Sequence, residues 1–152
     1  MKKYTILLLV ITSFSMSCTE DKLSEHEFTD QQIAAKNLAG DWGAAFNIVA
    51  PDIESADAIR LLTLLFTVDE NGNPDKFLSD GSLSTFGNKT GSWAWADGTT
   101  TTDVVLTEVG PITSFTISYS DNIDTITILF NAVNATGRGD AIGSYQVSFQ
   151  RL

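Results

Sequence analysis

Alternation of apolar and polar side chains runs along the chain from residue 41 to residue 152. Segment 143–152 is the clearest case, because Tyr145, Val147 and Phe149 alternate there with polar residues. Apolar residues that recur with a period of two, leaving one solvent-exposed face, are typical of half-buried antiparallel strands. The pattern predicts strands, separated by turn residues, at 41–50, 58–68, 90–96, 101–109, 113–120, 124–132 and 143–152. Segment 76–86 is poorly patterned, and we expect a short edge strand there.

Strand parity assigns each bulky side chain to a face. The predicted inward set comprises Trp42, Ala44, Phe46, Ile48, Leu62, Leu64, Phe66, Val68, Trp93, Trp95, Phe115, Ile117, Tyr119, Ile126, Ile128, Phe130, Tyr145, Val147, Phe149 and Arg151. A hydrophobic fraction of 43% is ample for a core of this kind.

The segment 28–40 has a different period and predicts a short helix. Thr29 and Gln32 have capping-box spacing, and Gly40 supplies a left-handed stop. The fold class predicted is therefore all-β: a small antiparallel eight-stranded up-and-down barrel preceded by a short helix, with a β-sandwich as the alternative.

The first residues resemble an export signal. Two lysines precede the apolar run "YTILLLVITSF", which is too short for a stable membrane span. Small residues then lead into Cys18, the only cysteine, in an arrangement that resembles the lipobox of bacterial lipoproteins. We expect residues 1–17 to be a lipoprotein signal peptide, and Cys18 to carry a lipid that holds the chain on a membrane.

Residues 18–27 have little apolar content and predict an acidic, solvated tether. Glu20 and Asp21 directly after the cysteine also resemble the signal that sends some lipoproteins to the outer face of the outer membrane. The working domain is then 28–152. We expect an outer membrane lipoprotein that is periplasmic or surface-exposed.

Composition removes several kinds of chemistry from the domain. The single histidine is His26 in the tether, so residues 28–152 contain neither His nor Cys, and we expect no cofactor and no Cys/His metal site. Net charge is −10 without a basic cluster after residue 3, which argues against nucleic acid as a partner. Most acids occur in turn segments, where Asp and Glu solubilise and form turns. We expect no enzyme activity.

The segment "DENGNPDKFLSD" offers oxygens at alternating positions from Asp69 onward. A calcium loop would need Gly at its sixth position, where this chain has Pro74. A hairpin turn on Asn71 and Gly72 explains the same residues, so we expect a hairpin rather than a metal site.

Five aromatic side chains with inward parity are candidates for the walls of a ligand site: Phe66, Trp93, Trp95, Tyr119 and Tyr145. The competing interpretation is that they fill the interior, because an eight-stranded barrel is just wide enough for its own side chains. If the indoles point outward, they could instead stack on sugar rings.

One pairing carries a resemblance to a known family. Gly40, Asp41 and Trp42 follow the short helix and open the first strand, and Arg151 ends the last one. This resembles the lipocalin (calycin) pattern, in which a Gly-x-Trp packs beneath an arginine from the last strand. Parity points Trp42 and Arg151 inward at the same end, as a barrel-closure pair. The chain is similar to small lipocalin-like lipoproteins of Gram-negative bacteria.

These observations together predict a non-catalytic binding role for a lipid-anchored envelope lipoprotein. The ligand expected first is small and apolar or amphiphilic, held in the barrel mouth opposite Trp42 and Arg151. The alternative is a surface module that docks a protein or glycan through Leu61, Leu65 and rows of Thr and Ser. A carboxylate-based hydrolase is the third. We expect a monomer.

Overall fold

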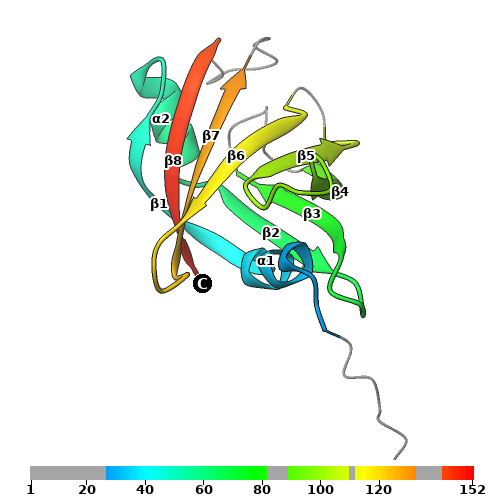
Figure 1. Cartoon of the computed structure of the whole chain (residues 1–152). Coiled ribbons are helices and arrows are strands. Elements are labelled where there is room, and N and C mark those ends of the chain that lie inside the picture. The colour runs from blue at the N-terminus through cyan, green and yellow to red at the C-terminus, as the bar shows by residue number, and fades with distance from the viewer. Residues whose placement is uncertain (1–26, 82–88, 110–111, 133–141) are drawn as a thin grey trace, which may run out of the picture.

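The computed structural model describes residues 27–81, 89–109, 112–132 and 142–152. Eight strands form one closed antiparallel up-and-down barrel in the order of the chain, and the last strand pairs with the first (Figure 1). The predicted all-β barrel is therefore confirmed. The elements are α1 (Asp30–Leu38), β1 (Gly40–Val49), α2 (Ile53–Ile59), β2 (Thr63–Val68), β3 (Pro74–Asp80), β4 (Lys89–Trp95), β5 (Asp103–Thr107), β6 (Ser114–Tyr119), β7 (Thr125–Ala132) and β8 (Gly143–Arg151). The signal peptide and most of the tether, Cys18 included, lie outside the described residues.

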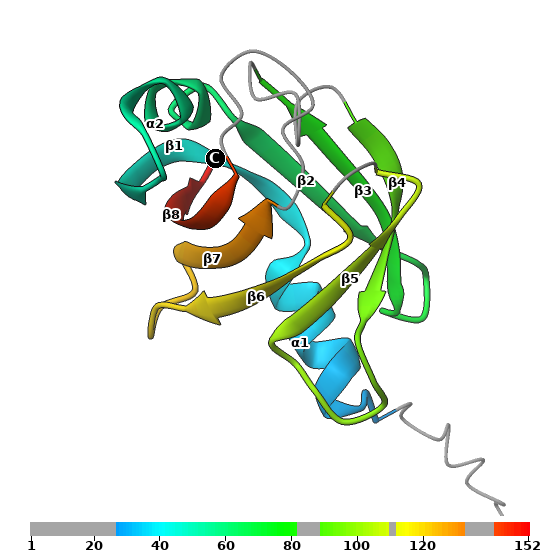
Figure 2. The ribbon, with the colours of Figure 1, turned by 90° about the horizontal axis from the view of Figure 1, so that it is seen from above.

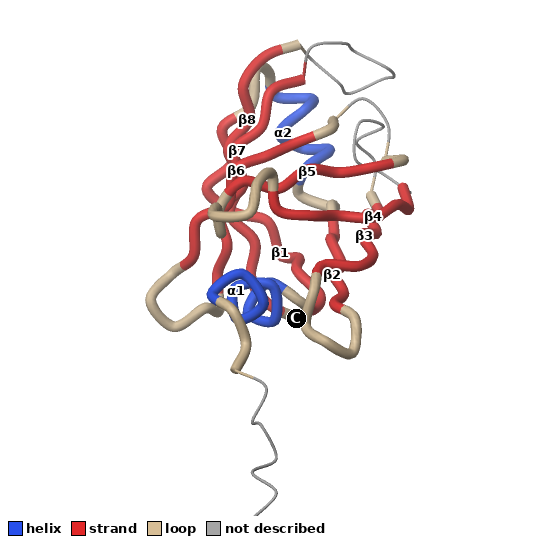
Figure 3. Tube along the Cα trace, turned by 45° about the vertical axis from the view of Figure 1, so that its right-hand side comes forward, coloured by secondary structure: helices blue, strands red, loops and turns tan. Residues whose placement is uncertain are grey.

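Helix α1 lies across one end of the barrel (Figure 3). Its predicted capping box is confirmed: the Thr29 hydroxyl accepts from the Gln32 amide, and the Gln32 side chain accepts from the Thr29 amide. Ala35 and Leu38 are buried against the core. Side-chain amides tie the helix to two turns, because Gln31 donates to the carbonyl of Asp97 and Gln32 to that of Asn71.

Helix α2 was not predicted, and the strand expected at 58–68 begins only at Thr63. Asp52 caps the helix by accepting from the Ser55 amide at 2.8 Å, and Ser55 and Ile59, one turn apart, form its buried face. Leu61 is 70% exposed and lies in the turn after α2, so the expected outer face with Leu65 on one strand was wrong.

Strand β3 starts at Pro74, two residues before the expected segment, and is more central than expected. It bonds to β2 on one side and β4 on the other, so it is not an edge strand. A closed barrel has no edge. The alternation was hidden because β3 points Ser79 inward in register with Leu64, where neighbouring strands place apolar residues.

Two bulges in β1 break the predicted parity. The register with β8 shifts between Gly43 and Phe46 and again between Phe46 and Val49. Ala44 and Asn47, at these shifts, both have φ of 48°. Ala44 is therefore exposed rather than inward, while Ala45 and Ile48 pack against the core.

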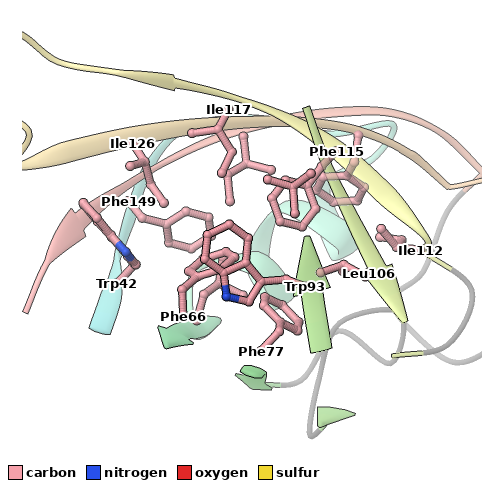
Figure 4. Packing of buried hydrophobic residues seen from close by; sticks show 14 of the residues in the cluster. Trp42, Phe66, Phe77, Trp93, Leu106, Ile112, Phe115, Ile117, Ile126 and Phe149 are labelled. Atoms are coloured by element: carbon pink, nitrogen blue, oxygen red, sulfur yellow. The ribbon is translucent and has the colours of Figure 1, made fainter. Parts of the chain in front are cut away.

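Apolar side chains fill the interior (Figure 4). Phe66 lies at its centre, with ring centroids at 5.1 Å from Phe77, 5.5 Å from Trp93 and 6.1 Å from Phe115. These separations and tilted geometries are the favourable ones for aromatic pairs. The barrel core is thus an aromatic cluster enclosed by aliphatic side chains.

Candidate functional site

The barrel has two different ends, and the α1 end is sealed. The guanidinium carbon of Arg151 lies 4.2 Å from the centroid of the Trp42 ring. The Trp42 indole donates to the Leu38 carbonyl at 2.8 Å, and Arg151 donates to the carbonyls of Ala39 and Asn37. These carbonyls belong to the C-terminal part of α1, where unpaired C=O groups and the helix dipole favour a cation. The arrangement matches the expectation from strand parity.

Four of the five aromatic residues predicted as ligand walls, namely Phe66, Trp93, Trp95 and Tyr145, contact other rings in the core. Phe66 and Trp93 pack edge to face, and Trp93 donates to the Thr67 carbonyl at 2.8 Å. Tyr145 is 3% exposed and stacks on Phe130 with ring centroids 4.7 Å apart. Whether any of them touches a ligand stays a prediction, but their faces are occupied by neighbouring side chains.

Two of the five, Trp95 and Tyr119, lie at the α1 end rather than in the mouth. The Trp95 indole donates to the Gln31 carbonyl of α1 at 3.1 Å. Tyr119 is the last residue of β6, and it lies close enough to Arg151 for that positive charge to lower the pKa of its phenol. The expectation that one mouth contains all five residues was therefore wrong, since it ignored the strand direction that places Trp95 and Tyr119 at the opposite end.

Tyr119 has an unusual environment at this closed end. Burial raises the pKa of its phenol to about 12, and the nearby positive charge of Arg151 lowers it only in part. Among the described residues its hydroxyl has no hydrogen-bond partner. The phenol therefore remains neutral at ordinary pH and is not a candidate base.

Helix α2 lies next to β1 at the opposite end of the barrel, which we call the mouth (Figures 1 and 2). Two serine hydroxyls are buried near it without a hydrogen-bond partner in the described part of the chain: Ser55 on α2, 0% exposed, and Ser79 on β3, 5% exposed. Lys89 is paired with Ser79 across the β3–β4 ladder. Buried hydroxyls without partners are uncommon and call for a water or ligand.

A groove of ≈ 560 Å³ crosses the outer face of β5, β6 and β7. Its exposed lining side chains are Ala96, Asp103, Val105, Thr113, Ser114, Thr116, Leu129 and Asn131. The Thr and Ser rows were visible in the sequence. Their convergence into one groove was not, because it depends on the register between strands.

The carboxylates of the described residues serve local structure. Asp69 accepts from the amides of Asn71 and Asn73 and from the Asn73 side chain, and these hydrogen bonds lower its pKa. This is the predicted hairpin turn between β2 and β3. Within the described ranges there is no group of three or more His, Cys, Asp or Glu placed to hold a metal ion.

None of the described helices has the length and apolar character needed to cross a bilayer.

The class that the fold defines is a closed eight-stranded antiparallel barrel. Comparison with protein-family models, with curated proteins and with solved structures found no match for this chain.

Proposed function

We propose that this chain is a lipid-anchored, non-catalytic binding protein of the Gram-negative envelope, built on a lipocalin-like barrel. Its ligand is held on the outer face of the barrel, in the groove over β5, β6 and β7. The observation that carries this proposal is the contrast between an interior packed with contacting rings and an open groove outside. Cys18 provides the anchor, and the domain works at the outer membrane, on its periplasmic or its surface side.

The position of α1 supports a defined orientation at the membrane. The described part of the chain begins at residue 27, directly before α1 at the sealed end of the barrel (Figure 1). The eleven residues between Cys18 and α1 reach at most ~40 Å when extended. The mouth and the outer groove then stay accessible to ligands in the aqueous phase, while the Trp42 and Arg151 end lies nearest the membrane.

A second candidate is a small apolar or amphiphilic ligand in the mouth. The buried hydroxyls of Ser55 and Ser79, and Lys89 beside Ser79, favour it as polar groups that a ligand headgroup would satisfy. Such a ligand would have to displace packed side chains, since Leu64 and Tyr145 are buried in the same core cluster. The packed core is why we rank the outer groove first.

Indole fluorescence separates the two candidates. The lipidated protein in detergent micelles is titrated with fatty acids and retinoid-like probes, with Ser79→Ala as the mouth variant. A surface-binding protein gives flat titrations for both proteins. A saturable shift that Ser79→Ala weakens would place the ligand in the mouth and overturn the proposed surface role.

The anchor is tested separately. Expression in a Gram-negative host should give a mature chain that begins at Cys18, carries acyl mass and partitions with the outer membrane. Cys18→Ala should abolish the acyl mass and release the protein from the membrane. An unmodified cysteine on an intact N-terminus would defeat this part of the proposal.

A further inference from the structure

We infer that the groove over β5, β6 and β7 binds an uncharged oligosaccharide; this rests on the proposed surface-binding function and names its ligand class. The inference starts from the outward side chains of β5 to β8, which we call the hydroxyl face. It consists of Asp103, Val105, Thr107, Ser114, Thr116, Ser118, Thr125, Thr127, Leu129, Asn131, Ser144, Gln146 and Gln150.

The registers bring these side chains into continuous rows. Asp103 pairs with Thr116, Thr116 with Leu129, and Leu129 with Gln146. A parallel row begins with Val105 and Ser114. Side chains directly opposite one another in such ladders lie within about 4.5–5.5 Å at Cβ, so each row places polar and apolar side chains close enough to contact one ligand.

Asp103 is the only charged residue of the hydroxyl face. Designed soluble proteins carry charge at roughly 25–35% of their surface positions. The other half of this barrel carries Asp41, Lys76 and Asp80 at exposed strand positions. A surface that offers hydroxyls and amides but hardly any charge complements a neutral ligand, because a charged ligand would lose its hydration without finding counter-charges there.

The groups in the groove match the chemistry of a sugar. Hydroxyl side chains both donate and accept, and so do sugar hydroxyls. Asp103 accepts from the Thr116 hydroxyl at 2.8 Å with one oxygen and from the Thr100 hydroxyl at 3.3 Å with the other. A carboxylate has about four lone-pair sites, so acceptor capacity remains for hydroxyls of a ligand.

Two apolar side chains complete the groove. Val105 is 36% exposed and Leu129 43% exposed, and both line it. They offer contact to the C–H groups of a sugar ring, which gain from leaving water. A protein partner would instead favour exposed Trp, Tyr or Arg anchors. The exposed side chains that line this groove include none of these.

Affinity electrophoresis tests the ligand class. The lipidated full chain, in a polyoxyethylene detergent that contains no sugar, is run through native gels with dextran, laminarin, mannan or xyloglucan. Polygalacturonate serves as the acidic polysaccharide. The test variant is Ser114→Arg, which places a long cation in the groove. Its matched control is Ser92→Arg, since Ser92 is also an exposed serine in a strand but lies outside the groove.

We expect at least one neutral polysaccharide to retard the wild-type chain and the Ser92→Arg control. Ser114→Arg should weaken that retardation at least tenfold while the thermal midpoint stays within the range of the control. Equal retardation of both variants, or no retardation by any neutral polysaccharide, overturns the inference. Retardation by polygalacturonate alone, lost in Ser114→Arg, would overturn the neutral ligand class but leave the surface-binding function standing.

Discussion

The guanidinium of Arg151 lies over the indole of Trp42 and at the same time donates to the carbonyls of Ala39 and Asn37. One side chain from the end of the last strand thereby joins the first strand and the helix that precedes it. A desolvated cation–π contact contributes about 2 kcal/mol, and hydrogen bonds to charged groups about 1.5–3 kcal/mol each. These contacts connect segments far apart in the sequence, so they stabilise the closed barrel directly.

Replacing Arg151 by Met should therefore lower the free energy of unfolding by about 2–4 kcal/mol, because it leaves two carbonyls unpaired. Urea denaturation of the full chain measures the loss. The control is Lys76→Met, since Lys76 is an exposed cation on β3 and its change should stay within about 0.5 kcal/mol. Equal losses in the two variants would show that the Arg151 contacts contribute nothing specific.

Gly40 is the second requirement for this closed end. Its φ is 131°, and a Cβ there would lie 2.7 Å from a terminal nitrogen of Arg151. Gly40→Ala should destabilise the protein by roughly 1–3 kcal/mol through backbone strain, and by more if the guanidinium is displaced. Gly98→Ala is the matched control, because a Cβ at Gly98 meets nothing within 4 Å. Thermal midpoints measured in parallel check the prediction, which fails if the two variants melt together.

Strand parity predicted much of this architecture and failed where the backbone is irregular. The faces of β6, β7 and β8 follow from alternation alone, as Ile117, Ile126 and Val147 show. Parity failed at Ala44, because a bulge depends on the pairing with the partner strand and cannot be recognised from the alternation of apolar and polar residues in β1 alone. The helix α2 was missed because Ala58 to Leu61 also fit the apolar run of the following strand.

The candidate site was less predictable than the fold. Sequence identified inward aromatic residues but not whether they leave space, which depends on how their rings meet. Phe66 meets Phe77, Trp93 and Phe115 at once only because four strands bring them together. The outer groove likewise depends on the registers that align Asp103, Thr116 and Leu129.

Tyr119 should make the protein sensitive to alkaline pH. Its pKa is raised from 10.0 to about 12 in the folded state, so the folded chain holds this proton more tightly than the unfolded chain. Stability linked to this group is fully present below pH 10, falls as pH rises, and is lost by about pH 12, a change of roughly 2–3 kcal/mol. Tyr119→Phe removes the titrating group and should flatten the decline. Urea midpoints measured between pH 8 and pH 12 follow the decline in stability. Parallel declines in the wild-type chain and in Tyr119→Phe would contradict the assignment of this decline to Tyr119.

The turn between β2 and β3 should be indifferent to calcium. The carboxylate of Asp69 accepts from two backbone amides and one side-chain amide, so its oxygens are already engaged. Adding calcium should leave the thermal midpoint of the full chain unchanged, and Asp69→Ala should lower it by loosening the hairpin. Calcium-dependent stabilisation that Asp69→Ala removes would instead support a metal site at this turn.

Phe66 offers the sharpest test of whether the interior is a packed core or a ligand cup. It is 1% exposed and contacts three other rings, so truncation would leave a cavity among side chains that cannot collapse fully. Phe66→Ala should cost about 3–5 kcal/mol of unfolding free energy. The same residue on the wall of an open cup would cost much less, because water already fills the space beside it. Leu129→Ala, an exposed truncation on β7, is the control and should cost well under 1 kcal/mol. A loss for Phe66→Ala as small as that of the control would mean that the barrel interior is open, and the ligand would then have to be sought inside it.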